Sequence, residues 1–383
     1  MSLSSTTTAR SFPTPRRGMP RKVLATLGVF GLLAVSIPIN LNYYWGTRHV
    51  AVPQSADALV EGHTAAAVTE NYNQAFLFKD AGIDLFGTLS WVLFHEGRKG
   101  VLAGSDDWLY SSEEFESDKG SPARIARAID FVANVRDRLA AKGVQLAVVA
   151  IPAKATIYPE HLGRYRLPAE PAGRHEALLE GLRVKGIDVV DPKPDLMAAK
   201  AGQQVYLRTD THWTPAGASV VAASVAKHLQ GREPGEEKQF QTKPAVADET
   251  YGGDLTRYVR LGGPAAALGP KPDLLQPFEA VASEEGSLLG DETVPVVLVG
   301  TSYSANARWS FEPALKVAMA RDVVNVAAEG QGPFKPMSTY LRSEAFRDTP
   351  PKLVVWEMPD RYVDDAFGPD SFQLDGPTVE ASR

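Results

Sequence analysis

The sequence predicts an α/β fold with a mostly parallel sheet. Several short apolar runs lack the alternation of inward and outward residues that a half-exposed strand shows, and predicted helices separate them. The runs are "VQLAVVAIP" (144–152), "IDVVDP" (187–192), "VPVVLVG" (294–300), "DVVNVA" (322–327) and "KLVVWEMP" (352–359). Strands that are apolar along their whole length are typical of parallel sheets covered by helices on both faces.

The helices between these runs are predicted from apolar spacing and from end signals. In residues 121–143, Ile125, Ile129, Val132 and Leu139 recur at helical spacing and Gly143 follows as a stop signal. Thr214 and Pro215 begin a second helix in the same way. Further helices are expected over 174–186 and near 336–346. We predict one α/β domain over residues 85–383, with a linker or helical region over 46–84 and irregular excursions near the site over 231–290.

The N-terminal region carries a charge pattern typical of membrane insertion. Residues 1–22 contain Arg10, Arg16, Arg17, Arg21 and Lys22 and no acidic residue, and an apolar stretch ending in "YYW" follows. A basic flank, an apolar span and an aromatic boundary predict a transmembrane signal-anchor over 23–45, with residues 1–22 in the cytoplasm. A cleaved signal peptide is the alternative. Both interpretations predict that the rest of the chain is exported, and the periplasm of a Gram-negative cell is the location expected for it.

Composition excludes several classes of function. The formal net charge of −6 argues against nucleic acid as the main partner, and the absence of cysteine excludes disulfides and thiolate chemistry. The histidines outside "DTHW" show no metal-ligand spacing; they are His49, His63, His95, His161, His175 and His228. We therefore expect no metal and no cofactor.

The candidate catalytic residues are Asp210, His212 and Ser302. Asp210 and His212 follow "QVYLRTD" (204–210), which reads as a strand, and residues i and i+2 of an extended segment share a face. Ser302 follows the run 294–300, at the strand end where α/β sheets bind ligands. Together they predict a serine nucleophile, a histidine base and an orienting carboxylate. Each motif also has a structural interpretation when it is considered alone. The D-x-H pair is then a helix-capping acid beside a histidine, and the serine is a helix cap.

Other residues are candidates for substrate contact. Trp213 is expected either to stack on a sugar ring or to pack internally, and Tyr303 adjoins the nucleophile. Gly330 follows a strand and could bring a backbone N–H near the reacting oxygen. Glu357 and Arg361, at the end of "KLVVWEMPDR", are expected to pair with each other or to contact substrate.

Four motifs in consistent order resemble the alginate O-acetyltransferase family (AlgJ/AlgX-like). They are "GVLAGSDDWLY", "TDTHW", "VGTSYS" and "VVWEMPDR", and the resemblance covers about residues 85–365. It implies an SGNH-hydrolase-like three-layer domain anchored in the inner membrane, with the triad on Asp210, His212 and Ser302. It also implies an exopolysaccharide substrate and a separate multi-pass membrane acyltransferase that supplies acetyl groups. The order Asp, His, Ser departs from SGNH hydrolases at large and agrees with this family.

Three functions remain open on these residues. The first is an acetyltransferase that forms an acyl-enzyme on Ser302 and passes the acetyl group to a sugar hydroxyl. The second is a carbohydrate acetylesterase with the same triad and water as acceptor. The third is a non-catalytic polysaccharide-binding scaffold, against which the intact Asp, His and Ser argue. A subtilisin-type protease is disfavoured, because its histidine lies far from its aspartate in sequence.

Overall fold

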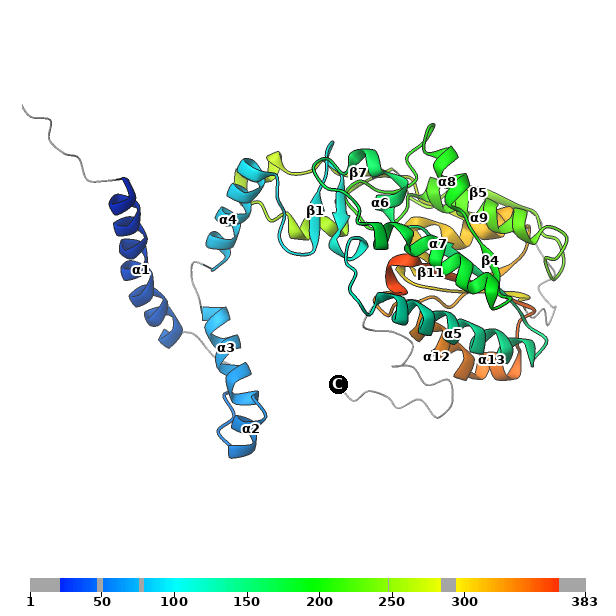
Figure 1. Cartoon of the computed structure of the whole chain (residues 1–383), viewed down its shortest axis with the longest axis horizontal. Coiled ribbons are helices and arrows are strands. Elements are labelled where there is room, and N and C mark those ends of the chain that lie inside the picture. The colour runs from blue at the N-terminus through cyan, green and yellow to red at the C-terminus, as the bar shows by residue number, and fades with distance from the viewer. Residues whose placement is uncertain (1–20, 47–50, 76–78, 247, 284–293, 365–383) are drawn as a thin grey trace, which may run out of the picture. The chain divides into compact units, whose positions relative to one another are not determined.

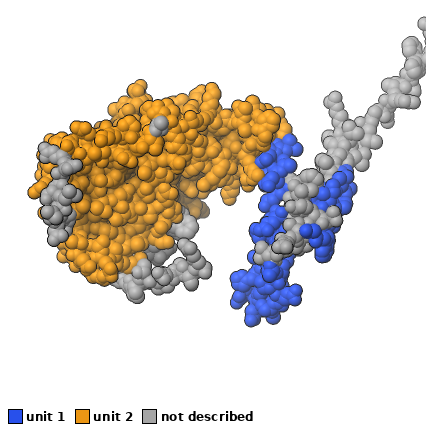
Figure 2. Space-filling view, turned by 180° about the vertical axis from the view of Figure 1, so that it is seen from behind, with its two compact units in different colours: residues 1–86 blue, residues 87–383 orange. Residues whose placement is uncertain are grey.

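The computed structural model describes residues 21–46, 51–75, 79–246, 248–283 and 294–364. Most of the expected cytoplasmic segment, residues 1–22, lies outside these ranges. The chain forms two compact units, Met1–Phe86 and Gly87–Arg383 (Figure 2), and each is described by itself.

The first unit is helical. Its helices are α1 (Arg21–Gly46), α2 (Ala56–Val60), α3 (His63–Ala75) and the beginning of α4 (Lys79–Phe94). Helix α1 covers the segment expected to be a membrane anchor. Among the described residues, however, no helix combines the length and the apolar character that crossing a bilayer requires. The membrane anchor therefore stays a prediction.

A five-stranded sheet forms the centre of the second unit. Its strands are β3 (Gln145–Ile151), β4 (Asp188–Val190), β9 (Val296–Val299), β10 (Val323–Asn325) and β11 (Leu353–Pro359). They lie in the order β10-β9-β11-β3-β4, and every neighbouring pair is parallel. Each strand lies in one of the apolar runs from which a parallel sheet was predicted, so that prediction is confirmed.

Helices cover both faces of this sheet, which gives the three layers expected (Figure 1). Alternate strand residues enter two separate cores: Val148 and Val354 belong to one, and Val149 and Val355 to the other. The first core contains residues of α5 (Ser121–Ala140), α7 (Ala169–Val184), α12 (Phe334–Arg342) and α13 (Glu344–Asp348). The second contains residues of α6 (Lys154–Ile157), α8 (Lys193–Ala199), α9 (Pro215–Leu229) and α11 (Phe311–Met319).

Three antiparallel pairs lie outside the main sheet. They are β1 (Val101–Ala103) with β2 (Leu109–Ser111), β5 (Phe240–Pro244) with β8 (Phe278–Ala282), and β6 (Glu249–Tyr251) with β7 (Asp273–Leu275). Residues 231–283 therefore contain more regular structure than predicted, although their β6–β7 part does reach the candidate site.

The expectation of a strand over 204–210 is wrong. This segment makes only one isolated bridge, between Tyr206 and Trp213, and otherwise forms a loop. Asp273 on β7 takes the place of a neighbouring strand, because its carboxylate accepts hydrogen bonds from the backbone N–H groups of Arg208 and Thr209 at 3.1 and 3.0 Å. The apolar residues of this segment do not distinguish a loop from a strand. Val205 and Leu207 are buried in the observed loop, as they would be in a strand.

Candidate active site

Ser302 lies at a strand-to-helix turn at the carboxyl end of β9. Gly300 and Thr301 connect β9 to the short helix α10 (Ser302–Ala305), whose first residue is Ser302. The side chain of Thr301 caps α10 by accepting from the backbone N–H of Tyr303. This turn raises the serine side chain above the carboxyl edge of the sheet, where α/β folds bind ligands.

Asp210, His212 and Ser302 form a continuous chain of hydrogen bonds. The Nδ1 atom of His212 lies 2.5 Å from Oδ1 of Asp210, and its Nε2 atom lies 2.7 Å from Oγ of Ser302. An ionised carboxylate can only accept, so the imidazole proton lies on Nδ1. Nε2 is therefore the acceptor for the serine hydroxyl, as a general base requires. The imidazole is largely buried, and Ser302 is partly exposed, so a substrate can reach it.

Four donors fix the carboxylate of Asp210. Oδ1 accepts from the backbone N–H and the ring of His212, and Oδ2 accepts from the Tyr251 hydroxyl at 2.9 Å and the Asp254 N–H at 2.8 Å. Burial on its own would raise the pKa of Asp210, but the hydrogen bonds from His212 and Asp254 hold it well below its usual value. Asp210 thus stays ionised and orients the imidazole.

The residues meet through a turn and not through a shared strand face. Because the backbone N–H of His212 donates back to Oδ1 of Asp210, the aspartate closes a local turn of the kind that Asp side chains favour. The structure thus brings the predicted pair into contact, while the extended geometry proposed for it is wrong.

Aromatic rings enclose the imidazole. The Trp309 ring is stacked on it with centroids 4.9 Å apart, and the Tyr303 ring lies 4.5 Å away at a steeper angle. Tyr303 also donates its hydroxyl to the carbonyl of Thr211. Both rings are buried, so they exclude water from the side of the base that faces the protein. Trp309, Tyr251 and Asp254 were not identified from the sequence, because nothing in their local pattern marks them.

Trp213 and Gly330 have different surroundings. Trp213 is fully buried, and its ring packs against Tyr303 and Phe311, which agrees with the internal packing considered for it and leaves no face for a sugar. Gly330 is exposed in the turn that follows β10, with a φ of 69°. The N–H of Ala328 in the same loop donates to the carbonyl of Gly300. This loop therefore passes beside the turn that precedes Ser302.

Glu357 and Arg361 do not pair with each other, so that expectation is wrong. Glu357 is fully buried and accepts from the backbone N–H of Thr301 at 2.7 Å and from the Ser304 hydroxyl at 3.0 Å. Glu357 therefore holds the turn that carries Ser302 through its contacts with Thr301 and Ser304. Arg361 is also buried, and its guanidinium packs against the rings of Tyr303 and Tyr362. Glu357 lies on β11, whereas Arg361 lies in the 3₁₀ segment after it (Asp360–Tyr362), so the two side chains do not continue one strand face.

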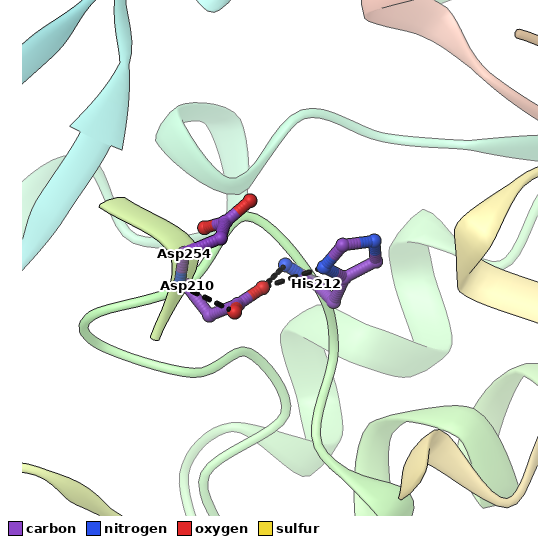
Figure 3. Close-up of side chains that lie close together, drawn as sticks. All are labelled: Asp210, His212 and Asp254. Atoms are coloured by element: carbon purple, nitrogen blue, oxygen red, sulfur yellow. Dashed lines mark hydrogen bonds and ion pairs between the residues drawn. The ribbon is translucent and has the colours of Figure 1, made fainter. Parts of the chain in front are cut away.

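Among the residues that the structure describes, one group of side chains has the spacing of metal ligands. The ligand atoms of Asp210, His212 and Asp254 all lie within 4.8 Å of one another (Figure 3). Hydrogen bonds already occupy these atoms, because Asp210 accepts four and the two carboxylate oxygens of Asp254 accept from the N–H and hydroxyl of Thr211. The donor set therefore fits a hydrogen-bonded dyad better than a cation.

The burial of Glu357 should make the stability of the folded protein depend on pH. Burial raises the pKa of Glu357 to about 7 from the ordinary glutamate value of 4.5, so the folded protein holds a proton that the unfolded chain releases between these values. The free energy of unfolding should then fall as pH rises from 4.5 to 7, by up to about 3 kcal/mol from this group. Glu357→Gln cannot ionise, so its stability relative to the wild type should increase over that window in urea titrations. The control is Glu344→Gln on an exposed position of α13, and an unchanging difference for Glu357→Gln would contradict the assignment.

Known proteins are similar to this chain in sequence and in overall structure. The family described as "SGNH hydrolase-like domain, acetyltransferase AlgX" matches residues 101–360. The probable alginate O-acetylase AlgJ of Azotobacter vinelandii is 38% identical over 357 residues, covering 90% of this chain and 89% of that protein. The corresponding protein of Pseudomonas syringae is 40% identical over 316 residues, 80% of each chain. The O-acetyltransferase domain of Pseudomonas putida AlgJ superposes with a TM-score of 0.66 at 38% identity, over 72% of this chain and 96% of that domain. On this similarity, the chain belongs to the AlgX-type family of SGNH hydrolase-like acetyltransferases.

Proposed function

We propose that this protein is an exopolysaccharide O-acetyltransferase that uses Ser302 as nucleophile, His212 as general base and acid, and Asp210 as the orienting carboxylate. The observation that carries the proposal is the hydrogen-bond chain from Asp210 through His212 to Ser302, with Nε2 of the imidazole 2.7 Å from the serine hydroxyl. Membership of an acetyltransferase family supports the type of reaction.

In the first half-reaction, Oγ of Ser302 attacks the carbonyl carbon of an acetyl donor. His212 Nε2 takes the serine proton as the new C–O bond forms, and then gives it to the leaving group as the bond to the donor breaks. Asp210 stabilises the imidazolium that exists between these two transfers. The backbone N–H of Ser302 lies in the first turn of α10, where helix N–H groups lack an intrahelical acceptor, and it is a donor for the developing oxyanion.

In the second half-reaction, a sugar hydroxyl attacks the acetyl group on Ser302. His212 removes the hydroxyl proton and returns it to Oγ of Ser302, which restores the enzyme and leaves an O-acetylated sugar. Water competes for the same step and would give acetate. The buried Tyr303 and Trp309 rings beside His212 limit the approach of water from within the protein.

The names of the relatives and the N-terminal sequence support a proposal for the substrate and the location of the protein. Alginate appears in the names of the relatives, so a uronic-acid exopolysaccharide is the acceptor that we propose for this chain. The basic and apolar N-terminal sequence supports a single-pass anchor over residues 23–45 in the inner membrane, with residues 85–383 as the catalytic domain in the periplasm. A multi-pass membrane acyltransferase would then deliver the acetyl group across that membrane.

The proposal is tested by looking for the acetylated product. The full chain, purified in detergent, is incubated with p-nitrophenyl acetate as donor and with mannuronate or glucan oligosaccharides as acceptors. We expect mass spectrometry to show mannuronate oligosaccharides carrying added acetyl groups. If the only product is acetate, with the same yield whether or not oligosaccharide is present, the protein is an esterase and the transferase proposal fails.

A further inference from the structure

Lys154 is a buried cation that the proposed reaction does not use. It is the first residue of α6 and follows the carboxyl end of β3, the strand beside β11 in the sheet. Its side chain is only 1% exposed and lies beside the rings of Trp108 and Tyr110, with Nζ 5.7 and 5.2 Å from the ring centroids. An ammonium group in such a place costs free energy unless every proton has an acceptor.

The loop that carries Asp210 supplies those acceptors. Nζ of Lys154 donates to the backbone carbonyls of Leu207 at 3.1 Å, Arg208 at 3.2 Å and Asp210 at 2.7 Å. The ammonium has three protons, and these contacts engage all of them. The shortest contact is to the residue whose side chain orients the catalytic imidazole.

Lys154 and Asp273 bind different backbone groups of this loop: Lys154 contacts carbonyl groups, and Asp273 contacts N–H groups. Asp273 accepts from the N–H groups of Arg208 and Thr209, whereas Lys154 donates to carbonyls of the same segment. A strand would satisfy both kinds of group by pairing with a neighbour. Here the backbone N–H of Leu109 on β2 donates to the carbonyl of Arg208, and the two charged side chains add their contacts to this backbone pairing. The position of the Asp210–His212 pair therefore depends on charges that come from β7 and α6.

We propose that Lys154 is a positioning residue, whose ammonium group holds the loop over residues 207–210 so that His212 meets Ser302. The proposal rests on the proposed catalytic role of these residues. Lys154 acts through the loop and has no contact with the reacting atoms, so its loss should reduce the reactivity of Ser302 more than the binding of a reagent. A misplacement of about 1 Å in such a pair typically costs on the order of a hundredfold in rate.

The positioning depends on the charge of Lys154. Four carboxylates face the ammonium: Glu114, which ends the 3₁₀ segment after β2, Asp210, Asp254 and Asp273. Burial lowers the pKa of Lys154 to about 8, although these carboxylates oppose the shift. Between a pH of about 8 and the ordinary lysine pKa of 10.5, the folded protein has lost a proton that the unfolded chain keeps. The contribution of this group to folding stability then increases with pH. Loss of reactivity above pH 8 should therefore occur without unfolding.

The test measures how fast Ser302 is modified by phenylmethanesulfonyl fluoride in the full-length protein. Wild-type, Lys154→Met and Lys154→Arg proteins are compared from pH 6.5 to 9.5, with circular dichroism at each pH and Ser302→Ala as background. We expect the wild-type rate to fall as pH rises through about 8. We expect Lys154→Met to react about a hundredfold more slowly than the wild type below pH 8, without this alkaline fall. Lys154→Arg, which keeps a cation, should recover part of the rate and should not show the fall.

A second lysine of the same region is the control. Nζ of Lys200 donates to the carbonyl of Ile157 at the end of α6 and to Glu160, and it has no contact with residues 207–212. Lys200→Met should leave the Ser302 reactivity and its pH profile unchanged. If Lys154→Met does not fold, the wild-type protein alone tests the proposal. Its rate of Ser302 modification should then fall above pH 8 while its circular dichroism spectrum stays constant.

Two results would overturn the proposal in different ways. If wild-type Ser302 is modified at a constant rate across pH 8 and equally fast in Lys154→Met, the ammonium does not position the pair, while the proposed nucleophile stands. If wild-type Ser302 is no more reactive than the background protein, the proposed function fails, and the role of Lys154 fails with it.

Discussion

Replacing Ser302 with alanine is expected to lower acetyl transfer by at least about 10⁴-fold, because the proposed acyl-enzyme forms on the hydroxyl that this substitution removes. The hydroxyl that is removed is the one 2.7 Å from Nε2 of His212. Release of p-nitrophenol from p-nitrophenyl acetate measures the loss. His212→Ala should cost a similar factor, and the double variant should cost little more, because the two residues act as a unit.

The control for Ser302→Ala is another serine whose hydroxyl is not near the site. Ser219 on α9 donates its hydroxyl to the carbonyl of Pro215 within the same helix. Ser219→Ala should therefore keep close to full activity, and both variants should show the wild-type circular dichroism spectrum. Undiminished release of p-nitrophenol by folded Ser302→Ala protein would reject the assigned nucleophile.

Replacing Asp210 with asparagine is expected to lower the turnover number by about 10⁴-fold while KM changes little. All four contacts of the Asp210 carboxylate are with donors, so an amide NH₂ must face a donor wherever it is placed. If the amide turns its NH₂ toward His212, the imidazole proton must move to Nε2, and that nitrogen can no longer accept the serine proton. If it turns toward Tyr251 and Asp254, those donors lose their acceptor, at a cost of about 1–3 kcal/mol in stability.

Asp254→Asn is the matched control for Asp210→Asn. Asp254 lies beside the same loop, but its carboxylate accepts from Thr211 and makes no hydrogen bond to the imidazole. Its substitution should cost stability and much less turnover than Asp210→Asn. A larger loss of turnover in Asp254→Asn than in Asp210→Asn would mean that the orienting acid has been misassigned.

The strands of the main sheet were predictable because burial on both faces requires apolar residues at every position of a strand. Runs such as 144–152 and 352–359 are apolar along their length, since alternate residues enter two different cores. Ser302 was predictable for a related reason, as it directly follows one of these runs. The loop over 204–210 also contains apolar residues, and we predicted it to be a strand for that reason. Its hydrogen bonds to Asp273 and Lys154 could not be predicted, because these residues are distant in sequence.

The residues that hold Asp210 and Glu357 in place could not be found from the sequence. Tyr251 and Asp254 come from a region read as irregular, and each touches Asp210 with one polar group. Glu357 was singled out at a strand end, but its partner was taken to be Arg361 and is in fact the turn around Thr301. Such contacts depend on which side chains converge at the carboxyl edge of the sheet, and local spacing does not record that convergence.

The sequence by itself determined the α/β class, the apolar strands of the sheet and the identity of Asp210, His212 and Ser302 as candidates, because burial and local order are written in neighbouring residues. The tertiary structure alone decided how these three side chains meet, with His212 held between a four-fold hydrogen-bonded carboxylate and the serine. The reason is physical: hydrogen-bond geometry at the site is fixed by groups from β6, β7, β9, β11 and α6, which only folding brings together.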